Sequence, residues 1–110
     1  MYYAHIWLDD CRKPNIPNQG KELVYWVKGY DTFVDTVKML KQNIGRCMVH
    51  FDHDLGEEKT GYDCAKFLAN WCLDNEYYLP DYDIQSSNPV GRKNIESVFE
   101  SYWKVKLADF

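Results

Sequence analysis

Short apolar runs alternate with amphipathic stretches along the chain, and this alternation predicts the secondary structure. Four runs are short, apolar or aromatic, and bounded by acids or turn formers, as strands are. They cover residues 3–8, 23–27, 46–51 and 82–85. Three longer stretches place apolar residues at helical spacing, and these cover about 31–42, 60–75 and 89–105. Strands that alternate with helices predict an α/β domain with a mainly parallel sheet of about four strands and three helices.

Polar residues mark where each predicted helix begins. Asp31 is a good N-cap for the first helix, Thr60 can cap the second, and Asn88 followed by Pro89 is a strong start for the third. The inward-facing positions are Phe33, Val34, Val37 and Leu40, then Cys64, Ala65, Leu68, Trp71 and Cys72, then Ile95, Val98, Phe99 and Tyr102. Residues 11–21 are rich in Pro, Gly and Asn, which predicts an irregular crossover between the first two strands.

The composition fits one globular domain over residues 1–110. Hydrophobic residues make up 45% and charged residues 27%, a balance too apolar for a disordered chain and too often interrupted by charge for a membrane span. The first ten residues lack a basic leader and reach Asp9 and Asp10 early, so we expect the protein to stay in the cytoplasm. The net charge of −4 gives no support for general nucleic-acid binding through a basic face, although it is compatible with a local basic patch.

The chain has four cysteines, none of them in a C-x-x-C spacing: Cys11, Cys47, Cys64 and Cys72. Two disulfides or a four-thiolate zinc site are conceivable from the count alone. However, Cys64 and Cys72 lie on the apolar side of a predicted helix, and cytosolic thiols stay reduced. We therefore expect reduced cysteines that act as small buried hydrophobic residues.

Acidic residues follow two of the predicted strands directly. Asp9 and Asp10 follow the first strand, and Asp52 and Asp54 follow the third. Because ligands collect at the carboxyl ends of parallel strands, we expect these carboxylates to share one edge of the sheet. Their mutual repulsion would be relieved by a hard divalent cation, and Mg²⁺ prefers carboxylates together with water and substrate phosphate. The alternative is that individual aspartates point into solvent or form Asx turns.

The segment after the fourth strand carries groups suited to an anion. A helix N-terminus offers unpaired N–H groups there, and Arg12 near the acidic pair could clamp a phosphate or pair with an aspartate. The candidate phosphate-binding residues are Arg12, Ser86, Ser87, Asn88, Gly91, Arg92 and Lys93. A solvated first turn is the alternative. His53 is a candidate metal ligand or general acid–base, or else packs beneath its loop. His5 and His50 lie within strands and should sit on a sheet face.

Together, these residues form blocks with a specific order and spacing. The blocks are 8–14 (LDDCRKP), 26–28 (WVK), 51–56 (FDHDLG), 61–63 (GYD) and 86–94 (SSNPVGRKN). From Ile6 to about Tyr102 the chain resembles the cyclic-phosphate-processing receiver-like domain family, a divergent relative of response-regulator receivers. The resemblance implies a flavodoxin-like three-layer sandwich that acts on cyclic phosphates of nucleotides or RNA ends.

The resemblance also assigns roles by position. It matches Asp9, Asp10, Asp52 and Asp54 to acidic metal-binding positions, and Ser86, Asn88 and Arg92 to the polar block. One position departs from the family pattern: Gln85 stands where the family usually has a His. If that His donates a proton to the leaving oxygen, this protein would be slow or would rely on His53.

The sequence therefore leads to a hypothesis with alternatives. The hypothesis is a phosphoesterase-type domain, dependent on Mg²⁺ or Mn²⁺, with Asp52, His53 and Asp54 as catalytic residues. Its partner would be a cyclic nucleotide or a small ligand ending in a cyclic phosphate. The alternatives are a non-catalytic binder that sequesters a cyclic nucleotide, such as a phage would use against host immunity, and a degenerate receiver module. The sequence does not determine which cyclic phosphate is bound or the oligomeric state. Candidates for stacking on a base are Tyr62, Trp26 and Tyr30, although such residues also serve as core.

Overall fold

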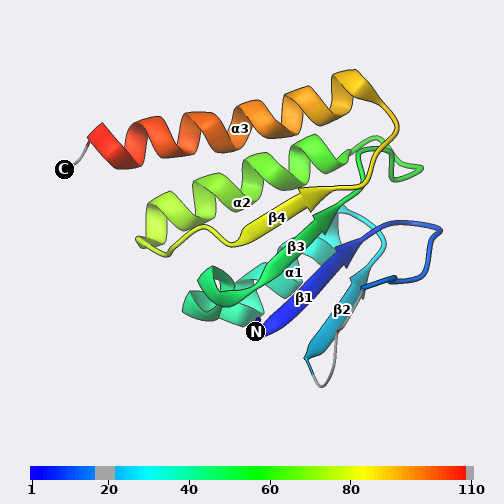
Figure 1. Cartoon of the computed structure of the whole chain (residues 1–110), viewed down its shortest axis with the longest axis horizontal. Helices are drawn as coiled ribbons and strands as arrows, with labels where there is room; N and C mark the ends of the chain where they lie inside the picture. The colour runs from blue at the N-terminus through cyan, green and yellow to red at the C-terminus, as the bar shows by residue number, and fades with distance from the viewer. Residues whose placement is uncertain (17–21, 109–110) are drawn as a thin grey trace.

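The fold is a parallel sheet with helices packed on it, and a computed structural model describes it for residues 1–16 and 22–108 (Figure 1). The strands are β1 (Ala4–Leu8), β2 (Leu23–Val27), β3 (Met48–Phe51) and β4 (Asp81–Ile84). The helices are α1 (Tyr30–Leu40), α2 (Gly61–Asn75) and α3 (Pro89–Ala108), with a 3₁₀ helix, η1 (Lys41–Arg46), after α1. The strand order is β2-β1-β3-β4, and all neighbouring strands are parallel. The predicted class, a small flavodoxin-like α/β domain, is confirmed.

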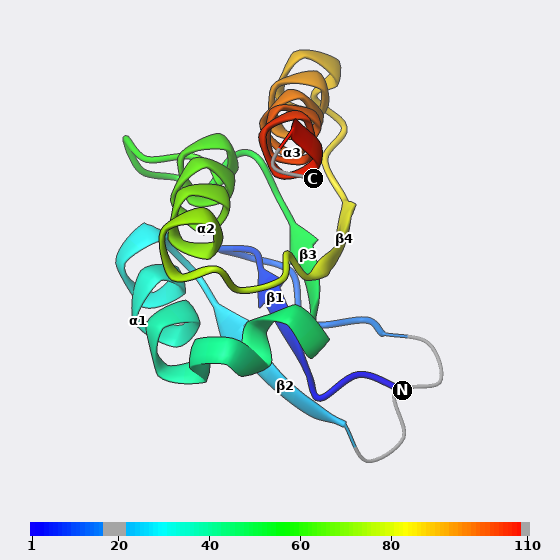
Figure 2. The same ribbon diagram turned by 90° about the vertical axis from the view of Figure 1, so that its left-hand side faces the viewer.

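The three helices cover the same face of the sheet. The ring of Phe51 on β3 packs 5.9 Å from Phe33 of α1 and 5.6 Å from Phe99 of α3, so both helices lie on the side to which this one ring points. Helix α2 lies between them and contacts both. Figure 2 shows the helices on one side of the sheet and the chain that leaves β1 on the other. The main core therefore lies between the sheet and this helical layer.

The opposite face of the sheet is polar and aromatic, yet buried. His5, Trp7 and His50 are at most 6% exposed, and the two imidazoles are hydrogen-bonded, with Nδ1 of His5 3.0 Å from Nε2 of His50. The indole Nε1 of Trp7 donates to the carbonyl of Arg12, which anchors the start of the β1–β2 connection over this face. The expected third layer is thus formed here by irregular chain. The predicted crossover over 11–21 is irregular as far as residue 16, and its residues 17–21 lie outside the described residues.

Two of the three predicted helix starts are confirmed. Thr60 caps α2 in a capping box, where its backbone N–H donates to the Asp63 carboxylate, and the Asn88 amide oxygen accepts the N–H of Gly91 at the start of α3. The prediction of Asp31 as the cap of α1 is wrong. Gly29 occupies the N-cap position instead, and its backbone N–H and carbonyl both bond the Thr32 hydroxyl. None of the described helices is long and apolar enough to cross a membrane.

Most predicted core positions are buried. Val34, Val98 and Trp71 are the exceptions among the helix positions, since each is only partly buried. All four cysteines are free, and Cys47, Cys64 and Cys72 are buried as expected, whereas Cys11 is exposed. Cys11 lies three residues after the end of β1, at the edge of the sheet and outside the core.

Candidate metal and phosphate site

Hydrogen bonds that continue the sheet past its strand ends bring the acidic residues together. The N–H of Asp9 donates to the Val27 carbonyl at 3.1 Å, and the N–H of Asp52 donates to the Leu8 carbonyl at 3.0 Å. These bonds align the chain after β1 with the chain after β3. As a result, one carboxylate oxygen from each of Asp9, Asp10 and Asp52 lies within 4.8 Å of the other two. The structure therefore brings together three of the four predicted metal ligands.

Asp9 is the most firmly held member of this carboxylate cluster, the name used below for Asp9, Asp10 and Asp52. It is 2% exposed, and its Oδ1 accepts the backbone N–H groups of Cys11 and Arg12 at 2.9 and 2.8 Å. Its Oδ2 accepts Nε of Arg12 at 2.8 Å. Burial acts to raise the pKa of the Asp9 carboxyl, but these bonds and the Arg12 charge outweigh burial and lower it. Asp9 is therefore a fixed negative charge.

Arg12 links two strand ends. While Nε bonds Asp9, Nη2 donates to the Gln85 carbonyl at 2.7 Å, immediately after β4. The side chain is nevertheless 58% exposed, which leaves part of the guanidinium open to solvent. Of the two alternatives for Arg12, pairing with an aspartate is the one that the structure shows. The exposed part of the group can still meet an anion beside the cluster.

Asp52 has the opposite electrostatics to Asp9. Burial raises the pKa of its carboxyl most, followed by the charge of Asp9, and Asp10 adds a smaller effect of the same sign. Arg12 and the His53 amide act to lower the pKa, but the net shift is upward. The neighbouring negative charges thus disfavour the ionised form of Asp52, and a bound cation would offset those charges. Three hard carboxylate oxygens without a matching set of positive partners suit Mg²⁺ or Mn²⁺. The donor chemistry therefore fits the predicted divalent cation.

Two glycines shape the loop beside the cluster. Gly56 has a φ of +67°, a conformation that favours glycine, and a Cβ there would lie 2.9 Å from Oδ2 of Asp10. A Cβ on Gly61 would lie 2.0 Å from the Asp52 carbonyl oxygen, so only glycine allows α2 to begin against the end of β3. These two positions were missed as site residues in the sequence. The only signal was their presence in the blocks that carry the resemblance.

The ring of His53 lies against Gly91 at the start of α3. Its Nδ1 lies 3.0 Å from Oδ1 of Asp54, and a Cβ on Gly91 would lie 2.4 Å from its ring. The close approach that Gly91 permits is therefore made by the His53 ring. Asp54, whose side chain is 70% exposed, pairs with His53 and lies outside the group of three carboxylates. The assignment of Asp54 as a metal ligand therefore stays a prediction, and the geometry does not support it.

The polar block after β4 largely satisfies its own hydrogen bonds. The Ser86 hydroxyl accepts the N–H of Asn88, and Asn88 in turn accepts the N–H groups of Gly91, through its side chain, and Arg92, through its carbonyl. Pro89 has no N–H. At the start of α3, these bonds therefore leave the backbone N–H of Val90 unused. Ser87 is exposed beside this turn. The helix start offers an anion far fewer donors than the sequence suggested.

Within the described residues, the two basic residues of this block form no hydrogen bond or ion pair with the carboxylate cluster. Nη1 of Arg92 donates to the Ile84 carbonyl at 2.5 Å, and the side chain lines a hollow with Glu96 and Glu100. Lys93 is exposed. Of the predicted phosphate ligands, Arg12 is the one that bonds a member of the carboxylate cluster.

The family of the chain follows from comparison with known proteins. No curated protein and no solved structure matches it. Residues 4–101 match the family model described as the cyclic-phosphate processing receiver domain. That match spans the strands, the carboxylate cluster, the His53 loop and the polar block after β4. The chain therefore belongs to the cyclic-phosphate processing receiver domain family.

Proposed function

We propose that this domain is a divalent-metal-dependent phosphoesterase that opens cyclic phosphates of nucleotides or RNA ends. The observation that supports the proposal is the carboxylate cluster, in which three ligand oxygens lie within 4.8 Å of one another at the carboxyl edge of the sheet. Repulsion in this group makes it a poor structural feature without a cation. The family membership supplies the substrate class.

The residues around the cluster have separate tasks in this proposal. Asp9, Asp10 and Asp52 would hold Mg²⁺ or Mn²⁺, which would supply polarisation of the phosphoryl group and an activated water. Arg12 fixes Asp9 and presents the exposed part of its guanidinium to the phosphate. In the reaction, a water oxygen forms a new bond to phosphorus, one ring P–O bond breaks, and the leaving oxygen takes up a proton.

His53 is the candidate for moving that proton. Oδ1 of Asp54 accepts from Nδ1 when this nitrogen is protonated, which leaves Nε2 for exchange with substrate or water. The contact with Gly91 fixes the ring position. Gln85, at the position where a His is expected, follows β4, and its carbonyl is bonded by Arg12. In this chain the imidazole nearest to the cluster along the sequence is therefore that of His53, which adjoins Asp52.

The test is turnover of a panel of 2′,3′-cyclic and 3′,5′-cyclic nucleotides and cyclic oligonucleotides, followed by product mass. We expect ring opening with Mg²⁺ or Mn²⁺, and its loss with EDTA and in Asp52→Asn. The matched control is Asp35→Asn, an exposed acid of α1, which should retain full activity. Intact ligands throughout the panel, or equal activity in EDTA, would refute the proposal.

A second candidate is a non-catalytic protein that sequesters a cyclic nucleotide. The absence of an imidazole at Gln85 favours it, because catalysis would then lack the expected proton donor. The two candidates separate in one experiment. A sequestering protein retains an intact cyclic nucleotide at equilibrium dialysis and shows no product, whereas the esterase converts it.

A further inference from the structure

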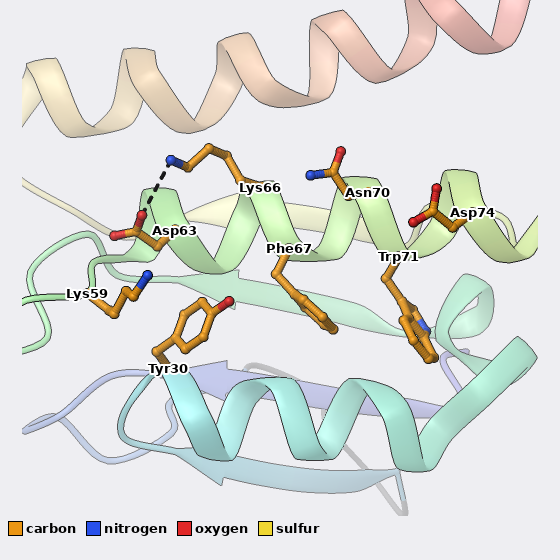
Figure 3. A pocket seen from close by; sticks show the side chains of 8 residues that line it. All are labelled: Tyr30, Lys59, Asp63, Lys66, Phe67, Asn70, Trp71 and Asp74. Atoms are coloured by element: carbon orange, nitrogen blue, oxygen red, sulfur yellow. Dashed lines mark ion pairs between the residues drawn. The ribbon is translucent and has the colours of Figure 1, made fainter.

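A groove between α1 and α2 lies outside the carboxylate cluster and is lined by aromatic rings and charged groups (Figure 3). Its volume is about 400 Å³, within the range of small-molecule sites. The lining residues are Tyr30, Lys59, Asp63, Lys66, Phe67, Asn70, Trp71 and Asp74. In Figure 3 the rings of Phe67 and Trp71 point from α2 toward α1, and Tyr30 reaches up from the start of α1.

The rings form one apolar side of the groove. Phe67 and Trp71 are neighbours on the face of α2, with centroids 5.9 Å apart and planes inclined by 22°. Both are only partly buried, although they pack against the core. A planar ligand can therefore cover their exposed surface, and stacking on such rings is how proteins hold bases without reading sequence.

The cations at the groove are held over rings. Nζ of Lys59 lies 5.1 Å from the ring centroid of Tyr30, and Nζ of Lys38 lies 5.6 Å from that of Trp71. Within residues 1–16 and 22–108, neither lysine forms an ion pair, whereas Lys66 pairs with Asp63 at 3.4 Å. Lys59 and Lys66 stand at the end of the groove nearest to the start of α2 (Figure 3). This end thus offers the ammonium group of Lys59 to an anion, next to an aromatic surface, whereas the Lys66 side chain reaches to Asp63 on the other side of α2.

The aromatic end carries an unused donor. Nε1 of Trp71 is buried and has no hydrogen-bond partner among the described residues. A buried donor without a partner is costly, so a ligand that brought an acceptor to this N–H would be stabilised. The amide of Asn70 lies one residue away and can both donate and accept.

We propose that this groove binds a nucleotide, with the base against Phe67 and Trp71 and the phosphate toward Lys59. The combination of partly exposed rings, an unused indole donor and, at one end, Lys59, which has no ion-pair partner among the described residues, fits a base joined to an anion. The proposal assigns a nucleotide site separate from the carboxylate cluster, and it holds whether or not the cluster is catalytic.

The test is a titration of ¹⁵N-labelled protein with AMP in EDTA, which removes any metal-dependent binding at the cluster. The indole N–H signal of Trp71, assigned by its loss in Trp71→Phe, should move and saturate, while that of Trp103 on α3 stays in place. Adenosine and ribose 5-phosphate each lack one half of the ligand. We expect each to bind at least about fivefold more weakly than AMP.

Matched variants separate the two ends of the groove. Phe67→Leu should weaken AMP and adenosine but leave ribose 5-phosphate unchanged, and Lys59→Gln should weaken AMP and ribose 5-phosphate but leave adenosine unchanged. Tyr78→Leu, which removes a ring that is 77% exposed elsewhere, should change nothing. Asp52→Asn should bind AMP as the wild type does. An unmoved Trp71 signal at millimolar AMP, or a response lost in Asp52→Asn, would overturn the proposal without bearing on cyclic-phosphate turnover.

Discussion

Replacing Asp52 by asparagine should stabilise the metal-free protein while removing its response to a divalent cation. Asn keeps the shape of the side chain, replaces one acceptor oxygen by an NH2 donor, and removes one of three neighbouring negative charges. In the wild type, burial and the charges of Asp9 and Asp10 raise the pKa of Asp52, so the folded state disfavours its ionised form. The substitution removes that unfavourable interaction.

The size of the effect follows from the geometry of the carboxylate cluster. Two unit charges 4.8 Å apart repel by about 3.5 kcal/mol at an effective dielectric constant of about 20. Arg12 offsets part of this repulsion, since its guanidinium bonds Asp9. We therefore expect a net gain of about 1 kcal/mol in the free energy of unfolding. For a domain of this size, that corresponds to a rise in Tm of about 5 °C.

The assay is thermal and urea unfolding in EDTA and across a Mg²⁺ titration. The pH dependence provides an internal check. A carboxyl whose folded-state pKa is raised binds protons more readily in the folded state, so its destabilising effect grows as pH rises above the unfolded pKa and disappears on acidification. The stability difference between Asp52→Asn and the wild type should therefore be largest at neutral pH and vanish toward the ordinary carboxyl pKa.

With Mg²⁺ the order should reverse, because the wild type gains binding energy that Asp52→Asn lacks. Asp35→Asn, on the exposed side of α1, should behave as the wild type in both conditions. A loss of stability for Asp52→Asn in EDTA, or an equal response of both proteins to Mg²⁺, would refute the reasoning.

Three further substitutions or measurements probe the groups around the cluster. Asp9→Asn should destabilise the protein by about 2 kcal/mol in urea unfolding, since it loses charge-assisted bonds; an effect of the same sign as in Asp52→Asn would contradict this. Gly91→Ala should displace the His53 ring and lower kcat by about tenfold or more, with KM little changed; an unaltered kcat would remove His53 from the mechanism. A thiol reagent at about pH 8 should label Cys11 alone, because the other thiols are buried. Mg²⁺ should accelerate the labelling by offsetting the Asp10 charge that raises the pKa of Cys11, and a rate unaffected by Mg²⁺ would count against a cation at the cluster.

The sequence pattern predicted helix starts correctly where the capping bonds join residues close together in the sequence. Thr60 and Asn88 cap helices because side-chain oxygens reach amides two or three residues away, and such bonds depend little on the rest of the fold. The start of α1 was misjudged because it depends on a distant residue. The N–H of Tyr30 donates to the carboxylate of Glu57, 27 positions along the chain, which no local pattern reveals.

The sequence pattern also did not predict what covers each face of the sheet. Alternating strands and helices predict a parallel sheet, but they do not state which face each helix covers. The two buried histidines, His5 and His50, are stable within the sheet because they bond each other at 3.0 Å and His50 also bonds Asp83 at 3.1 Å. These polar side chains can therefore be buried, because their hydrogen-bond partners lie on other strands.

For the site, the sequence by itself determined that acidic residues follow β1 and β3, because the ends of apolar strands are local and parallel strands share an edge. Tertiary structure decided which acids meet. The ladder bonds of Asp9 and Asp52 align the two segments, while the His53 contact with Gly91 carries Asp54 away. It also gave Arg92 of the polar block a backbone partner, since its guanidinium bonds the Ile84 carbonyl at the end of β4. The sequence specifies the inventory of charges, and the packing of loops against helix starts decides which of them share a site.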